Sequence, residues 1–180
     1  ATRERRGGFH SAPIAMVSVD FAEIEALQRS GDWHAAGAQL ADDARAIERA
    51  GADVLLICTN TMHKVAGAIA EAIDIPLLHL ADATAERIRA DGLDRVALLG
   101  TRFTMAEMFY RGRLEAQGLT VDVPNSGDME LVHEVIFDEL CQGVINPDSR
   151  ADYRRIIDAL AADGTQGVIA GCTEIGMLES

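Results

Sequence analysis

Two short segments of the chain place a cysteine-threonine pair at the end of an apolar run. Residues 53–57 lead into Cys58–Asn60, and residues 167–170 lead into Cys172–Glu174. Short apolar runs of this kind are typical of strands buried on both faces of a parallel sheet. Ligands bind beyond the carboxyl ends of such strands. Two thiols, one from each half of the chain, could therefore face each other across a cleft, which indicates a site for chemistry.

The composition excludes several classes of partner. The 180 residues are 48% hydrophobic, enough for the core of one large domain or two lobes. The net charge is -13 and Arg3–Arg6 is the one basic run, which argues against binding to nucleic acid. The apolar stretches are too short to span a bilayer. We therefore expect no membrane partner. The 3 cysteines suggest neither a disulfide framework nor a CxxC metal site, and we expect a cytoplasmic location.

Strand-like and helix-like segments alternate along the chain, which indicates a mainly parallel sheet. The apolar runs predict strands at 13–19, 54–57, 77–80, 95–100, 120–123 and 168–170. The helical periodicity predicts helices at 21–29, 33–50, 62–72, 82–91, 104–117, 131–140 and 147–163. The pattern restarts near Gly92. We therefore predict an α/β fold with two similar lobes, 1–93 and 94–180, each a mainly parallel sheet flanked by helices.

The two cysteine motifs carry a family resemblance. CTNTMH at 58–63 and GCTEIG at 171–176 resemble the aspartate/glutamate racemases, which are cofactor-independent amino-acid racemases; residues 10–21 and 98–105 strengthen the match. The resemblance covers essentially the whole chain. It implies two pseudo-symmetric lobes with the active site in the cleft between them, and a homodimer. It also implies a first strand and a Gly-rich loop before residue 1, and a last strand and helix after residue 180.

In the family, two cysteines flank the α-carbon of an amino acid. One thiolate removes the α-proton from one face and the other thiol protonates the opposite face, with neither pyridoxal phosphate nor a metal. The α-proton is only weakly acidic, so the base must lie close and the carbanion must be stabilised. We expect polar groups at Asn60, Thr61, Thr101 and Thr173 to hold the substrate carboxylate. A helix N-terminus after each motif would favour this carboxylate and lower the thiol pKa.

The first motif departs from the family pattern. The family motif usually reads Cys-Asn-Thr-x-His, and residues 60–63 match its last four positions, so Thr59 occupies the position of the catalytic cysteine. Cys58 lies one residue earlier, and neighbouring residues of a strand point to opposite faces. Comparison of the chain with itself instead pairs Cys58 with Cys172. The family register predicts Thr59 and Cys172 as the catalytic pair. Because threonine is a poor base, we expect maximal rates that differ between the two enantiomers.

The substrate side chain stays open. Aspartate-specific members carry an arginine after the second strand and a lysine in the second lobe, and residues 20–22 and 130–133 offer neither. Gln28 is a plausible substitute contact, so an acidic substrate and a broader specificity are both compatible with the sequence. Two other functions also fit. One is a decarboxylase or isomerase of small dicarboxylic acids from the same superfamily, and the other is a catalytically degenerate ligand-binding protein.

Three further residues have simpler interpretations. Cys141 lies within a helical run, where packing is the expected role. His63 follows the first motif and is expected to orient a loop, because no cluster supports a metal role. Glu174 either caps a helix N-terminus or contacts the substrate amine.

Overall fold

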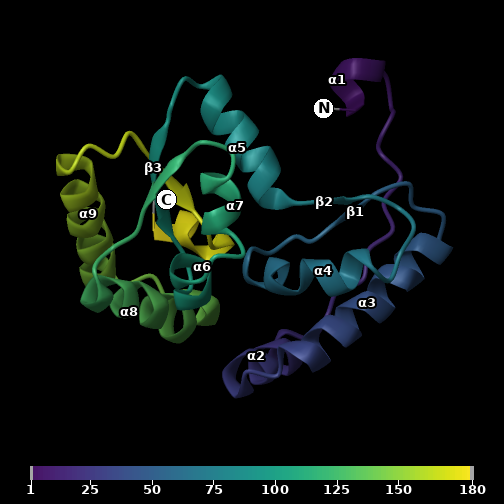
Figure 1. Ribbon diagram of the computed structural model, residues 1–180, viewed down its shortest axis with the longest axis horizontal. Helices are drawn as coiled ribbons and strands as arrows, with labels where there is room; N and C mark the ends of the chain where they lie inside the picture. The colour runs from purple at the N-terminus through teal and green to yellow at the C-terminus, as the bar shows by residue number, and fades with distance from the viewer. Residues whose placement is uncertain (1, 179–180) are drawn as a thin grey trace. The chain divides into compact units, whose positions relative to one another are not determined.

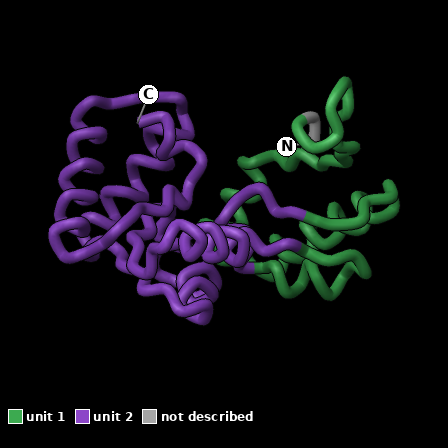
Figure 2. Tube along the Cα trace, turned by 90° about the horizontal axis from the view of Figure 1, so that it is seen from above, with its two compact units in different colours: residues 1–55, 65–77 green, residues 56–64, 78–180 purple. Residues whose placement is uncertain are grey.

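A computed structural model describes residues 2–178 (Figure 1). The chain divides into two compact units, residues 1–55 with 65–77 and residues 56–64 with 78–180 (Figure 2). The fold is mixed α/β with parallel strands flanked by helices, which confirms the predicted fold class. The lobe boundary near Gly92 stays a prediction, and both cysteine motifs belong to the second compact unit.

The first unit contains α1 (Thr2–Arg6), α2 (Phe21–Ser30), α3 (Trp33–Arg49) and α4 (Ala66–Ala70). Capping defines α2 and α3, which confirms both predicted helices. The side chain of Asp32 accepts a hydrogen bond from the Ala35 amide at the start of α3. Small residues let α3 and α4 approach closely, since a Cβ added at Gly37 would lie 3.4 Å from the Cβ of Ala68. Among residues 2–178, every helix is too short or too polar to span a bilayer.

The predicted strand at 13–19 is wrong. This segment has no regular structure, and its apolar side chains are exposed, with Ile14 at 82% and Met16 at 79%. A strand needs a partner for its backbone hydrogen bonds, and none pairs with this segment among residues 2–178. The next two predicted strands shorten to two residues each, β1 (Leu55–Leu56) and β2 (Leu77–Leu78), which pair with each other.

The second unit is built on a parallel sheet with the order β4-β3-β5. Its strands are β3 (Arg95–Leu99), β4 (Thr120–Asp122) and β5 (Gly167–Ala170), as the sequence predicts to within two residues. Both neighbours of β3 run parallel to it, and Leu99 is paired with Ala170. The carboxyl ends of β3 and β5 therefore meet at one edge of the sheet, where the second cysteine motif begins.

Helices cover both faces of this sheet (Figure 1). Val96 and Leu98 pack on one face against α5 (Leu80–Ala90) and α7 (Arg111–Glu115). Leu99 packs on the other face against α8 (Ser126–Glu134), the π-helix η2 (Val135–Glu139) and α9 (Pro147–Ala162). Alternate residues of β3 face opposite layers, so the continuous apolar run of this strand is explained by burial on both sides.

Three of the predicted helices differ in form. The helix expected at 104–117 is split into α6 (Arg102–Ala106) and α7, because Glu107 has extended backbone angles. The helix expected at 131–140 begins earlier, at Ser126, where the Asn125 side chain caps it, and continues as η2. The segment after the first motif is a 3-10 helix, η1 (Thr61–Val65), before α4 begins. The second motif is likewise followed by a 3-10 helix, η4 (Thr173–Leu178).

Candidate active site

A hydrogen bond between distant parts of the chain joins the two cysteine motifs. The side-chain amide Nδ2 of Asn60 donates to the carbonyl oxygen of Gly171 at 2.8 Å, across 111 positions of sequence. Asn60 follows Thr59, and Gly171 precedes Cys172. The polar segment of the first motif is therefore held against the strand end that carries Cys172.

Glycines allow close backbone packing at this point. The amide of Gly171 donates to the Leu99 carbonyl at 2.6 Å. A Cβ at Gly171 would lie 2.8 Å from that same oxygen, and a Cβ at Gly100 would lie 3.3 Å from the Thr104 side chain. Contacts below 3.0 Å require the backbone to shift. Glycine is therefore the residue that lets the loops after β3 and β5 pack against each other.

Three buried threonine hydroxyls form a triangle beside the Asn60 contact. The Oγ1 atoms of Thr61 and Thr101 are 3.1 Å apart, and Thr104 Oγ1 lies 3.3 Å and 3.2 Å from them. Thr101 also caps α6 by accepting from the Thr104 amide. A hydroxyl both donates and accepts, so each member can turn its proton toward a ligand while it accepts from a neighbour. The structure thus brings together two of the predicted carboxylate-binding residues.

Cys172 is held as a protonated thiol. Its Sγ donates to the Glu174 carboxylate oxygen Oε2 at 2.8 Å, and the exposed Thr173 hydroxyl donates to the same oxygen at 2.8 Å. Burial, followed by the hydrogen bond to Glu174, raises the pKa of the Cys172 thiol to about 12. The expectation of a lowered thiol pKa is therefore wrong for Cys172, because the sulfur is buried and faces a carboxylate.

The first motif bends away from strand geometry before its cysteine. β1 ends at Leu56, so Cys58 and Thr59 lie in a bend, and both residues are exposed. The Thr59 carbonyl oxygen lies 2.7 Å from His63 Nδ1. The alternation of strand side chains does not apply at these positions, and the choice of Thr59 over Cys58 stays a prediction that rests on the family register.

Gln28 belongs to the first unit, and it stays a predicted substrate contact. It lies in α2 with 6% of its surface exposed.

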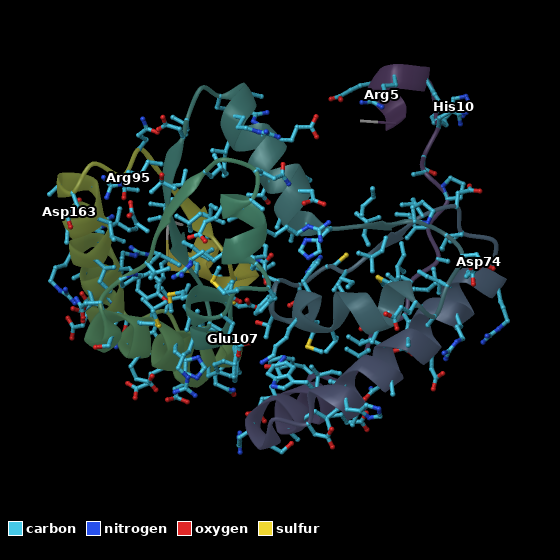
Figure 3. The ribbon with its side chains drawn as sticks, viewed as in Figure 1. Arg5, His10, Asp74, Arg95, Glu107 and Asp163 are labelled. Atoms are coloured by element: carbon cyan, nitrogen blue, oxygen red, sulfur yellow. The ribbon has the colours of Figure 1, made fainter. Side chains whose placement is uncertain are left out.

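Ion pairs neutralise the cations next to the site residues. Lys64, which follows His63, pairs with Glu107 at 2.6 Å, and Glu107 lies directly after α6 (Figure 3). Arg102, which follows Thr101, pairs with Glu130 at 3.2 Å. Within residues 2–178, no group of three or more histidine, cysteine or acidic side chains could hold a metal ion.

Two residues that contact predicted site residues were not predicted in that role from the sequence. Thr104 was not predicted, although its position three residues after Thr101 is the spacing of a helix N-cap contact. Glu174 lies in the first turn of η4, as one of its two expected roles requires, but the hydrogen bond that its carboxylate accepts from the Cys172 thiol was not predicted. Neither contact has a sequence signal stronger than local spacing, because each depends on how the loops pack.

The chain matches a racemase family along its whole length. Residues 1–180 match the sequence model of the Asp/Glu/Hydantoin racemases. A crystal structure of a candidate Asp/Glu racemase from Yersinia pestis is 52% identical with a TM-score of 0.90, covering 98% of this chain and 77% of that chain. The crystal structure of an aspartate racemase homologue from Pyrococcus horikoshii OT3 is 33% identical with a TM-score of 0.81 and the same coverage.

A third structure, the Picrophilus torridus aspartate racemase, shares the fold. It is 22% identical with a TM-score of 0.58, covering 76% of this chain and 55% of that chain. The family model and the first two structures confirm the resemblance drawn from the two cysteine motifs, and they support a racemase-type function. The chain belongs to the Asp/Glu/Hydantoin racemase family.

Proposed function

We propose that this protein is a cofactor-independent amino-acid racemase that transfers protons at both faces of the substrate α-carbon. The observation that supports this most directly is the hydrogen bond from Asn60 to Gly171. It fixes the residue after Thr59 against the residue before Cys172. The two predicted acid/base positions are thus each one residue from the same hydrogen bond, which supports a role for both at one substrate.

Cys172 acts as the proton donor on one face. With a pKa of about 12, roughly one thiol in 10⁵ is ionised at neutral pH, so the resting group holds its proton. Once the opposite face has lost the α-proton, the Cys172 S–H bond breaks and its proton moves to the carbanion. The thiolate left behind is close to the Glu174 carboxylate, and this repulsion favours proton transfer in the reverse direction or reprotonation from water.

Thr59 supplies the acid/base group on the opposite face of the α-carbon. A threonine hydroxyl is a far weaker acid than a thiol, so its alkoxide is scarcely populated and the step is slow. The reaction has an equilibrium constant of one, so the two enantiomers must have equal kcat/KM. The asymmetry therefore appears as different kcat values matched by different KM values. Equal kcat and equal KM for both enantiomers would contradict this part of the proposal.

Polar atoms around the motifs suit the two charged groups of an amino acid. Asn60 Oδ1 is buried and, among the described residues, makes no hydrogen bond, so it offers an acceptor for a substrate ammonium group. The hydroxyls of Thr61 and Thr101 offer donors for the carboxylate, which gains charge as the enediolate forms. An ammonium group close to Glu174 would also offset the carboxylate charge, which adds to burial in keeping the Cys172 thiol protonated.

The substrate specificity is proposed to be open: a broad range of side chains, or a neutral side chain, fits as well as an acidic one. Lys64 and Arg102 each pair with a carboxylate of the chain, so a substrate carboxylate would have to displace Glu107 or Glu130. Gln28 stays the proposed polar contact. Homodimer formation and a cytoplasmic location also stay predictions.

Proton NMR in D₂O with a panel of L-amino acids tests the proposal. We expect loss of the α-proton signal together with racemisation for at least one amino acid. Cys172→Ala and Thr59→Ala should abolish both, whereas Cys58→Ala should retain them. Absence of exchange with every amino acid would overturn the racemase proposal and would favour a ligand-binding protein.

A second candidate is favoured by the protonated state of Cys172. A decarboxylase of small dicarboxylic acids needs one proton donor: the bond to a carboxylate breaks, CO₂ leaves, and the thiol proton moves to the carbanion. Water then returns a proton to the thiolate. Release of CO₂ from a substituted malonic acid that survives Thr59→Ala but not Cys172→Ala would support this candidate over the racemase.

A further inference from the structure

Two buried histidines lie beside the first motif and are not used by the proposed proton transfers. His63 is 3% exposed and His79 is 7% exposed, and their ring centroids are 4.3 Å apart with a tilt of 56°. Buried polar side chains are normally hydrogen-bonded. The hydrogen-bond partners of the two histidines therefore indicate the roles of these residues.

Both ring nitrogens of His63 have defined partners. Nδ1 lies 2.7 Å from the Thr59 carbonyl oxygen, and Nε2 accepts from the Leu80 amide at 3.2 Å. A carbonyl oxygen only accepts, so Nδ1 must carry the proton. An amide only donates, so Nε2 must carry the lone pair. The neutral tautomer with hydrogen on Nδ1 is therefore the one that satisfies both contacts.

The two hydrogen bonds of His63 form a bridge from the Thr59 carbonyl to the Leu80 amide. The Leu80 end of this bridge belongs to a helix that is packed into the core. Leu80 is the first residue of α5, and Ala81 and Ala85 of this helix are fully buried against the sheet. His79 caps α5, because its Nδ1 accepts from the Ala81 amide at 3.2 Å. His63 thus links the exposed bend at Thr59 to a fixed point of the fold.

We propose that His63 is a positioning residue that holds the Thr59 backbone in register with the N-terminus of α5, and thereby sets the acid/base side chain opposite Cys172. This inference rests on the proposed function, in which residue 59 acts on the substrate. His63 does not touch the reacting atoms in this arrangement. It acts through its hydrogen bond to the Thr59 carbonyl.

The electrostatic surroundings keep the bridge neutral. Burial is the largest cause that lowers the pKa of His63, and burial and His63 together lower the pKa of His79 to about 4. Arg113 also lowers both values, and Asp82, its ion-pair partner at 2.7 Å, raises them. Protonation of Nε2 would turn it into a donor facing the Leu80 amide donor, so the bridge is intact at neutral pH and is lost in acid.

Two amide substitutions separate the two contacts. In His63→Asn, the side-chain NH₂ can take the place of Nδ1 and donate to Thr59, but the contact with Leu80 is lost. In His63→Gln, the side-chain oxygen can reach the place of Nε2 and accept from Leu80, but the contact with Thr59 is lost. Each variant keeps one of the two hydrogen bonds, so their losses of stability should be similar.

We expect kcat for α-proton exchange to fall about 100-fold in His63→Gln and only a few-fold in His63→Asn, with KM little changed in both. Equal losses of kcat in the two variants, or losses that follow their urea midpoints, would overturn the inference, because His63 would then act on stability alone.

A second readout does not depend on activity. A long-range proton-nitrogen NMR spectrum of the wild-type protein should show hydrogen on Nδ1 of His63 near neutral pH. Hydrogen on Nε2 would overturn the inference. Should the wild type exchange no amino acid, the proposed function fails, and the backbone amide shifts of Thr59 and Asn60 decide the positioning role. They should be retained in His63→Asn and moved in His63→Gln, and the reverse pattern would refute it.

Discussion

The Glu174 carboxylate contacts the Cys172 thiol, and we expect its replacement by glutamine to change the reactivity of this cysteine measurably. Burial is the largest cause of the raised thiol pKa and persists in Glu174→Gln, whereas the carboxylate 2.8 Å from the sulfur is lost. Removal of a like charge at this distance lowers the pKa of a thiol by about 1 to 2. Below that pKa, the thiolate fraction then rises about 10- to 100-fold.

The thiolate also becomes a weaker nucleophile as its pKa falls, by about 3- to 10-fold over this range. The net expectation is that iodoacetamide alkylates Cys172 about 3- to 10-fold faster in Glu174→Gln than in the wild type at about pH 8. Quantitative mass spectrometry of the cysteine peptides measures this rate, with the exposed Cys58 as the reference in the same sample. Glu115→Gln removes the same charge from an ion pair with Arg111 and serves as the matched control.

The opposite outcome would be informative. Slower alkylation of Cys172 in Glu174→Gln, with Cys58 unchanged, would show that the carboxylate draws the proton from the thiol and activates it. That result would refute the assignment of Cys172 as a resting proton donor.

Three further predictions follow from the site and its surroundings. Thr59→Cys restores a thiol at the family position and should raise kcat about 10²-fold for both enantiomers in a polarimetric assay; an unchanged kcat would count against the register. Gly171→Ala places a Cβ 2.8 Å from the Leu99 carbonyl and should lower the free energy of unfolding by about 1–3 kcal/mol in urea titrations. The unfolded protein binds more protons than the folded one between the lowered pKa of His79, about 4, and its ordinary value near 6.5. Stability should therefore fall as pH drops through this range, by at most about 1.4 kcal/mol per pH unit for this group. His79→Asn, which can still cap α5, should flatten this dependence in urea titrations at several pH values.

Elements with a long periodic pattern were predictable from the sequence. The helices α3 and α9 follow their apolar stripes, and Pro147 begins α9 as its missing amide allows. The apolar run of β3 predicts burial on both faces, and helices packed on each side of the sheet provide it. These elements depend on local sequence and on one continuous core.

The strand expected at 13–19 shows where sequence reasoning fails. A run of apolar residues describes a segment that could join a sheet, but the hydrogen bonds of a strand come from its neighbour. No such neighbour exists for it within the described part of the chain. The same reason accounts for the two-residue length of β1 and β2, since their apolar runs extend further than their pairing.

The proximity of the predicted site residues was more predictable than their chemical state. The family resemblance groups Asn60, Thr61, Thr101 and Cys172 in one site, and the structure joins Asn60 to Gly171 and Thr61 to Thr101. Their roles stay predictions. The protonation of Cys172 depends on burial and on the direction of the Glu174 side chain. Both arise from tertiary packing, which the spacing of residues in a motif does not encode.

The most direct test of the account follows inversion and deuterium uptake together in one reaction. A single enantiomer is incubated in D₂O with the wild-type protein, and chiral chromatography with mass detection separates the two enantiomers. The account predicts that every inverted molecule carries one α-deuterium, because the hydrogen that it gains comes from a solvent-exchanged group of the enzyme, which is the Cys172 thiol for one of the two enantiomers. Inversion without deuterium, or inversion that persists at the wild-type rate in Cys172→Ala, would contradict proton transfer by Cys172.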